Sequence, residues 1–158
     1  MLRLALLLIA LAASLLPLPA PALAQEPAAQ PGVRTVELDG RRVRIQALGL
    51  ENRRPGQPVV VFEAGATSSL DAWRQVLPEV AAGAPVIAYD RAGLGQSEPD
   101  AVQPTPRHVT GRLRRLLRQS GAEPPYVLVG HSWGGMLIHY YAGYHPEEVA
   151  GLVFVDPA

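Results

Sequence analysis

Five consecutive residues have the types and spacing of a serine nucleophile site. Residues 130–134, Gly-His-Ser-Trp-Gly, match the pattern G-x-S-x-G and follow the apolar run 126–129. This pattern places a serine on a sharp turn between a strand and a helix, with its hydroxyl exposed. The strained turn and the close approach of neighbouring backbone leave no room for a Cβ at the flanking positions. Ser132 is therefore the predicted nucleophile. The alternative, an ordinary turn with a capping serine, does not explain the two glycines after Trp133.

A serine hydroxyl is a weak nucleophile until a base accepts its proton, and that base is usually a histidine oriented by a carboxylate. The sequence contains four histidines: His108, His131, His139 and His145. None is predicted to reach the hydroxyl. His139, for example, lies two helical turns beyond Ser132, about 10 Å away along the helix axis. We therefore expect structural or solvent-exposed roles for all four.

One carboxylate is a candidate for the acid of such a site. Asp156 follows a predicted strand at its carboxyl end, the edge where parallel sheets place their sites. The alternative is that Asp156 caps a turn with the following proline. Asp90 and Arg91 resemble a catalytic pair, but an aspartate beside a glycine-rich loop usually binds backbone N–H groups. We interpret both residues as structural.

The elements that must position these residues alternate between strands and helices. Residues 33–38 and 42–48 alternate apolar and polar side chains around Asp39-Gly40, the pattern of a β-hairpin. Apolar runs predict buried strands at 58–62, 85–89, 126–129 and 151–155, and helices are expected at 70–80, from 106 to a stop at Gly121, and from 132 to about 145. This order predicts an α/β fold: a mostly parallel sheet with helices on both faces and an N-terminal antiparallel hairpin.

The first residues predict the location of the protein. Residues 1–24 contain Arg3, the apolar run 4–16 and an Ala-Leu-Ala site, which is typical of a secretory signal peptide. An uncleaved N-terminal anchor is the alternative. Residues 25–32 are rich in Pro, Ala and Gln, so we expect a disordered linker. The protein is therefore expected to be exported, periplasmic or secreted, without stable membrane insertion after cleavage.

Composition and missing motifs exclude other classes of protein. The 14 basic and 14 acidic residues balance, so no nucleic acid or anionic membrane is expected as a partner. The chain has no cysteine, which excludes disulfides and a thiolate nucleophile. Gly93 and Gly95 begin a dinucleotide-type pattern, but Glu98 replaces its third glycine. No phosphate loop and no H-E-x-x-H motif occur, so no cofactor and no metal is expected.

Four segments, in this order, resemble the α/β-hydrolase superfamily over residues 34–156. They are the loop 62–69, Trp73, the D-R-x-G-x-G-x-S stretch 89–97, and residues 130–135. The resemblance implies that the backbone N–H groups of Ala66 and Trp133 form an oxyanion hole. Such donors stabilise charge that develops in the transition state. Ala64 stands where many members have histidine, which is tolerable because the donor is a backbone N–H.

The resemblance also implies a domain boundary and a function. Family members carry the acid and the histidine well downstream of the serine. Residues 33–158 are therefore expected to be the N-terminal part of an incomplete α/β-hydrolase domain, truncated after its sixth strand. The implied activity is hydrolysis of a small-molecule ester, or less favourably an amide, through an acyl-serine intermediate. Serine at position 132 argues against dehalogenase or epoxide-hydrolase chemistry, for which the resemblance calls for aspartate. The alternatives are a non-catalytic fragment that lacks the histidine and an acyltransferase that uses the same nucleophile.

Overall fold

A computed structural model of the chain describes residues 30–158. The predicted signal peptide and most of the predicted linker lie outside the described residues. The last linker residues lie against the second strand: the carbonyl of Pro31 accepts from Gln46 Nε2 at 2.9 Å, and that of Gly32 accepts from Ala47 N at 3.0 Å. Within residues 30–158, no helix is both long and apolar enough to span a membrane.

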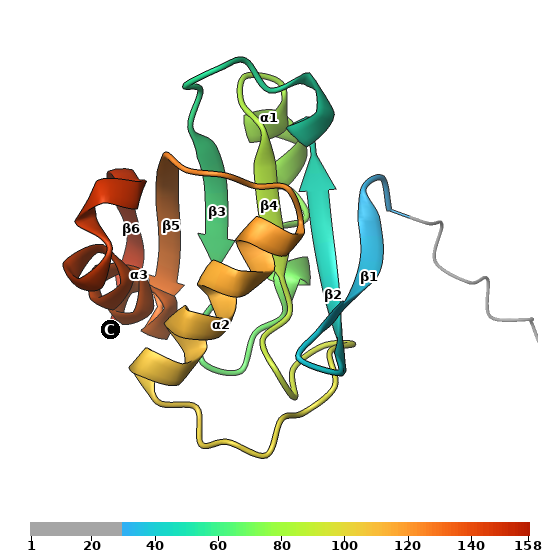
Figure 1. Ribbon diagram of the computed structural model, residues 1–158, viewed down its shortest axis with the longest axis vertical. Coiled ribbons are helices and arrows are strands. Elements are labelled where there is room, and N and C mark those ends of the chain that lie inside the picture. Colours follow the sequence, from blue (N-terminus) through green and yellow to red (C-terminus); the bar gives the residue numbers. More distant parts are fainter. Residues whose placement is uncertain (1–29) are drawn as a thin grey trace, which may run out of the picture.

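The fold is a six-stranded sheet with helices on both faces (Figure 1). The strands are β1 (Val33–Leu38), β2 (Arg41–Leu48), β3 (Val59–Glu63), β4 (Val86–Tyr89), β5 (Tyr126–Ser132) and β6 (Val149–Pro157). The helices are α1 (Leu77–Ala81), α2 (Pro106–Gln119) and α3 (Trp133–Tyr144), with 3-10 turns η1 (Leu50–Asn52), η2 (Leu70–Trp73) and η3 (Pro146–Glu148). The predicted alternation of strands and helices is confirmed.

The strand order is β1-β2-β4-β3-β5-β6. β2 runs antiparallel to both β1 and β4, and the other neighbours are parallel. The hairpin turns at Asp39 and Gly40, whose φ angles are 54° and 71°. Positive φ at both central residues is the geometry of a two-residue hairpin turn, which the Asp-Gly sequence predicts. The predicted mixed sheet with its N-terminal hairpin is therefore confirmed.

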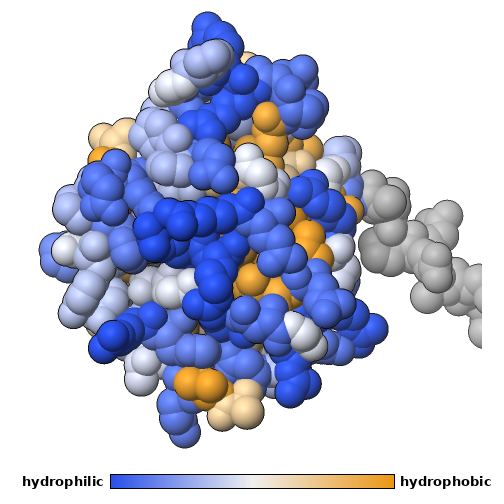
Figure 2. Space-filling model, in the orientation of Figure 1, coloured by the Kyte–Doolittle hydropathy of each residue, from blue (hydrophilic) through white to orange (hydrophobic). Residues whose placement is uncertain are grey.

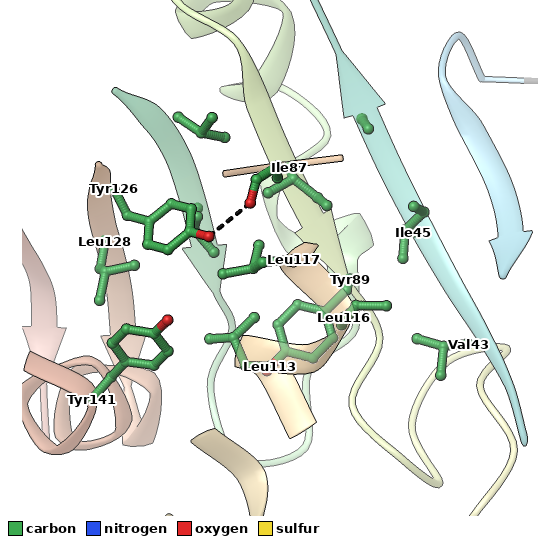
Figure 3. Close-up of a cluster of buried hydrophobic side chains, with 14 of the residues drawn as sticks. Val43, Ile45, Ile87, Tyr89, Leu113, Leu116, Leu117, Tyr126, Leu128 and Tyr141 are labelled. Carbon is green, nitrogen blue, oxygen red and sulfur yellow. Dashed lines mark hydrogen bonds between the residues drawn. The ribbon is translucent and has the colours of Figure 1, made fainter. Parts of the chain in front are cut away.

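Each face of the sheet has its own buried apolar layer. α2 and α3 cover one face, where Leu113, Leu116 and Leu117 of α2 pack with Tyr141 of α3 and with the sheet (Figure 3). Tyr126 of β5 lies in this layer, and its hydroxyl donates to the carbonyl of Ala122 at 2.7 Å. η2 and α1 cover the other face: Leu70, Trp73 and Leu77 pack there with Phe62.

One predicted helix differs from the structure. A continuous helix was expected over residues 70–80, but the chain forms η2 at 70–73 and the short α1 at 77–81. Pro78 explains the interruption, because proline has no N–H to donate to the preceding turn and is tolerated in the first turn of a helix, where α1 places it. The buried residues Leu70, Trp73 and Leu77 still face the sheet, as their spacing predicts.

Candidate active site

Ser132 lies at the junction of β5 and α3, at the carboxyl edge of the sheet. It is the last residue of β5 and the N-cap of α3, with φ 50° and ψ −124°. Residues other than glycine rarely adopt a positive φ, and residues with such a strained backbone are concentrated at functional sites. The predicted sharp turn is therefore present, and it holds Ser132 partly exposed.

The glycines around Ser132 are required by close backbone contacts. A Cβ on Gly130 would lie 2.5 Å from the carbonyl oxygen of Gly134. A Cβ on Gly134 would overlap the carbonyl oxygen of Glu63 and lie 2.7 Å from that of Ala64. On Gly135 it would lie 2.8 Å from Pro157 Cβ. Any side chain at these three positions would force the backbone of the turn, β3 or β6 to move.

Ala66 and Trp133, whose N–H groups are the predicted oxyanion donors, line one pocket of about 430 Å³. The Arg91 side chain contacts both of these residues. Its Nη1 donates to the carbonyl of Ala64 at 2.6 Å, and its Nη2 donates to the carbonyls of Gly65 and, at 3.1 Å, of Ala66. Its guanidinium carbon lies 5.0 Å from the centroid of a Trp133 ring, which is a cation–π contact.

The bond to Gly65 fixes the direction of the predicted donor at Ala66. In a trans peptide the C=O of one residue and the N–H of the next point in opposite directions. The Gly65 carbonyl points to the Arg91 guanidinium, so the Ala66 N–H points away from it. Arg91, together with the Ser68 N–H that donates to the same carbonyl at 3.1 Å, therefore sets the orientation of this loop after β3.

A buried ion pair holds Arg91 in turn. Glu63 is 1% exposed; its carboxylate accepts from Arg91 Nη1 and from the Tyr89 hydroxyl, each at 2.5 Å. Burial raises the pKa of Glu63, while Arg91 and Tyr89 act against that rise. Burial also raises the pKa of Tyr89. The interpretation of Asp90 agrees with its contacts, because its carboxylate accepts from the backbone N–H of Leu70 at 2.7 Å and of Gln96 at 2.8 Å.

No histidine binds Ser132 within residues 30–158. The ring of His131 packs on Trp73 at a centroid distance of 6.4 Å, His139 is exposed on α3, and that of His145 lies 5.2 Å from that of Tyr141. His108 is bonded to Asp100, Nε2 to Oδ2, at 2.8 Å. The described part of the chain therefore holds Ser132 without a proton acceptor.

Asp156 lies at the same sheet edge as Ser132. β5 and β6 are parallel, and after an irregularity in register Ser132 pairs with Pro157, the residue after Asp156. Asp156 is exposed and has a positive φ of 42°. Its carboxylate forms no hydrogen bond within residues 30–158, so the structure brings it near Ser132 without assigning it a partner.

The sequence analysis missed three residues that line the same pocket as Ala66 and Trp133. They are Asp100 in the loop after β4 and His108 and Arg112 on α2. The loop has no periodic pattern, so its position against α2 could not be predicted. No group of three or more His, Asp or Glu side chains within residues 30–158 could hold a metal ion.

A parallel sheet in which one strand ends at a strained serine, on a sharp turn into a helix, is the arrangement of the α/β proteins that have a nucleophile turn. The model of the alpha/beta hydrolase fold family matches residues 58–158, and the chain belongs to that family.

Relatives of the chain within the family are named for different reactions. The chain is 35% identical to epoxide hydrolase A of Mycobacterium tuberculosis over 125 residues, 77% of this chain and 37% of the relative. It is 34% identical to haloalkane dehalogenase of Bradyrhizobium diazoefficiens over 127 residues, 78% of this chain and 40% of the relative. The crystal structure of Cfl2 from Burkholderia cenocepacia matches with a TM-score of 0.70 and 28% identity, over 80% of this chain and 41% of that one. The chain thus spans about two fifths of each of these proteins.

Proposed function

We propose that the protein is a serine hydrolase that cleaves small-molecule esters through an acyl-serine intermediate. The observation that supports this most is the position of Ser132 on its strained turn, with Ala66 and Trp133 lining a pocket beside it. A hydroxyl at such a turn can approach a carbonyl carbon while two backbone N–H groups bind the developing oxyanion. Amides are the second substrate class, because their carbonyl needs the same groups.

The reaction proceeds in two steps. Ser132 Oγ attacks the ester carbonyl as a histidine accepts its proton, the bond to the alcohol oxygen breaks, and that oxygen takes the proton. Water then attacks the acyl-serine, activated by the same histidine, and releases the acid. We propose that this histidine lies outside residues 30–158, because none of the four described histidines binds Ser132. Asp156 is the proposed acid, because it lies at the edge where Ser132 is presented.

The names of two relatives suggest a second function, opening of an epoxide or removal of a halide. The residue at the turn argues against both reactions. The α/β-hydrolase resemblance calls for aspartate as the nucleophile in those enzymes, and this chain has Ser132. An alkyl-serine ether would form in place of a hydrolysable ester, so the cycle would stop after one turnover. Acyl transfer to an acceptor other than water remains compatible with the same residues, and product analysis separates it from hydrolysis.

Labelling with a fluorophosphonate tests the proposal on the full-length protein. The probe forms a covalent bond only with an activated serine, so we expect one adduct, on the peptide that contains Ser132. Ser132→Ala is expected to abolish the adduct. Ser68→Ala is the matched control, because Ser68 is a partly exposed serine in the loop that precedes η2, and labelling should persist. Folded wild-type protein that takes up no probe would contradict the proposal and favour a non-catalytic chain.

A further inference from the structure

We propose that Arg112, held by Asp100, binds a neutral hydrogen-bond-accepting group on the substrate, such as a ketone, ether or amide carbonyl. The proposal rests on the proposed function, because it concerns the pocket beside Ser132. The same pocket is lined by the proposed oxyanion donors, Ala66 and Trp133, and by Asp100, His108 and Arg112. A substrate whose carbonyl is bound at the first pair can therefore extend one of its two substituents toward the second group.

The rest of the pocket lining is mainly apolar. Leu94, Pro99, Val102 and Val109 contribute to it. Ligand pockets of a few hundred Å³ typically combine such walls with a few well-placed polar groups that fix orientation. The volume of about 430 Å³ lies in that range. The substituent that fits is therefore an apolar chain with a polar group at a distance from the ester, rather than a polar chain throughout.

Arg112 has donors that the protein leaves available. Its Nη1 lies 3.4 Å from Asp100 Oδ2 and 3.5 Å from Asp39 Oδ2. Its Nε and Nη2 form no hydrogen bond with any residue in 30–158, although a guanidinium has five N–H donors. The side chain is only 11% exposed. These N–H groups are therefore free to donate to an acceptor on a ligand in the pocket.

Asp100 fixes the geometry of the group. One oxygen, Oδ2, contacts both His108 Nε2 at 2.8 Å and Arg112 Nη1 at 3.4 Å. The Asp100 side chain is also 11% exposed. Burial acts to raise the pKa of Asp100, but the bonds from His108 and from the Val102 N–H outweigh burial, so its pKa is lowered. The carboxylate thus stays charged and holds Arg112 in place against the pocket.

The charges near Arg112 favour a neutral acceptor over an anion. Asp100 and Asp39 face its guanidinium from the loop after β4 and from the β1–β2 turn. Asp39 also pairs with Arg115 of α2 at 2.8 Å. The charges of these two arginines and two aspartates sum to zero. A carboxylate on the ligand would therefore meet two carboxylates of the protein, whereas a ketone or ether oxygen needs only the free N–H groups.

Two pairs of isosteric esters test the proposal on the full-length enzyme. The acyl pair is the nitrophenyl ester of pentanoate and that of levulinate, which differs by a ketone oxygen. The alcohol pair is pentyl acetate and ethoxyethyl acetate, which differs by an ether oxygen. For at least one pair, the oxygen-containing ester should be preferred in kcat/KM. Arg112→Met should reduce this preference about tenfold, the value of one hydrogen bond to a charged donor.

The ratio within a pair does not depend on the fraction of enzyme that is folded, because both esters are measured with the same sample. Arg107→Met is the matched control, since Arg107 is an exposed arginine on the same helix that does not line this pocket, and it should leave both ratios unchanged. Equal ratios in wild type and Arg112→Met for both pairs would overturn the proposal. A preference for the nitrophenyl monoester of glutarate, which carries a carboxylate, would overturn the neutral-acceptor assignment.

A failure of the proposed function would give a different result. In that case none of the esters is hydrolysed and no fluorophosphonate adduct forms. The binding site can then be tested alone, by saturation-transfer NMR with methyl levulinate and methyl pentanoate. Methyl levulinate should bind to wild type more strongly than methyl pentanoate, and Arg112→Met should remove the difference. Equal binding of the two esters to wild type would overturn the proposal.

Discussion

Arg91 contacts the surroundings of both predicted oxyanion donors. It binds three successive carbonyls of the loop 64–66, stacks on Trp133 and is anchored by Glu63. A lysine at this position keeps the charge but cannot offer the planar set of donors that this loop requires. The loop after β3 would then be free to rotate its peptides away from the orientation that presents the Ala66 N–H.

Arg91→Lys is therefore expected to lower kcat of the full-length enzyme about a hundredfold, the typical effect of losing one oxyanion donor. KM should change far less, because the donor binds the transition state more strongly than the substrate. Steady-state kinetics measures both. Arg34→Lys, an exposed arginine on β1, should behave as wild type. A rise in KM with kcat intact would mean that Arg91 binds substrate and does not orient the loop.

Single residues differ in how far the sequence predicts them. The turn at Ser132 could be predicted because its requirements are local: an apolar strand, glycines on either side and a following helix. The interpretation of Asp90 as structural needed only its neighbours in the chain. Arg91 could be interpreted as structural but its contacts could not be predicted, and His108 and Arg112 were missed. Those contacts depend on how the loop after β4 packs against β3 and α2, which no short pattern specifies.

At the scale of elements, α3 begins directly after Ser132, and its first turn packs against the backbone of β3 at Gly134, where there is no side chain. A Cβ on Gly134 would meet the backbone of Glu63 and Ala64, while one on Gly143 near the end of the same helix would meet nothing within 4 Å. Gly134→Ala should therefore destabilise the protein by about 1–3 kcal/mol, as overpacking does. Gly143→Ala should stabilise it by up to about 1 kcal/mol through helix propensity. Urea unfolding measures both; a neutral Gly134→Ala would contradict the close contact.

Glu148 joins α2 to the end of α3. The residue is 4% exposed, and its carboxylate accepts from Arg114 and Arg118 of α2 and from the Tyr141 hydroxyl. Burial raises the pKa of Glu148, but the bonds from Arg114, Tyr141 and Arg118 outweigh burial and hold its pKa at about 2, below the usual 4.5. The stabilisation is therefore present above about pH 4.5 and is lost as the pH falls toward 2.

Glu148→Gln tests this linkage. At neutral pH the variant should be less stable than wild type, by on the order of 3 kcal/mol. The difference in the free energy of unfolding should shrink as the pH is lowered from about 5 to about 2, since wild type then also carries a neutral side chain. Denaturant titrations of both proteins across this range measure it. A difference that stays constant with pH would show that the contribution of Glu148 does not depend on its charge.

The whole molecule presents its candidate site at one edge of a mixed sheet, and the face that α2 covers is mostly hydrophilic at its surface (Figure 2). The order of strands and helices, the hairpin and the two apolar layers could be predicted, because each depends on composition and periodicity along the chain. The division of residues 70–81 into η2 and α1 was missed, although Pro78 is a signal in the sequence against a continuous helix.

Export is a prediction at this scale. We expect cleavage after Ala24, so that the mature protein begins at Gln25. Intact mass and N-terminal sequencing of the protein recovered outside the cytoplasm would measure this. Replacing Ala22 and Ala24 by bulky residues should leave the precursor uncleaved. A protein that keeps Met1 and stays in the cytoplasm would contradict the prediction.

The central claim is that a substrate acyl group becomes attached to Ser132. The most direct measurement mixes full-length protein with a nitrophenyl ester, quenches the reaction with acid before turnover is complete, and maps the modified peptide by mass spectrometry. The account predicts one acyl group on the Ser132 hydroxyl and none in Ser132→Ala. Turnover of the ester with the acyl group on another residue, or with no acyl group bound to the protein at any time, would contradict it.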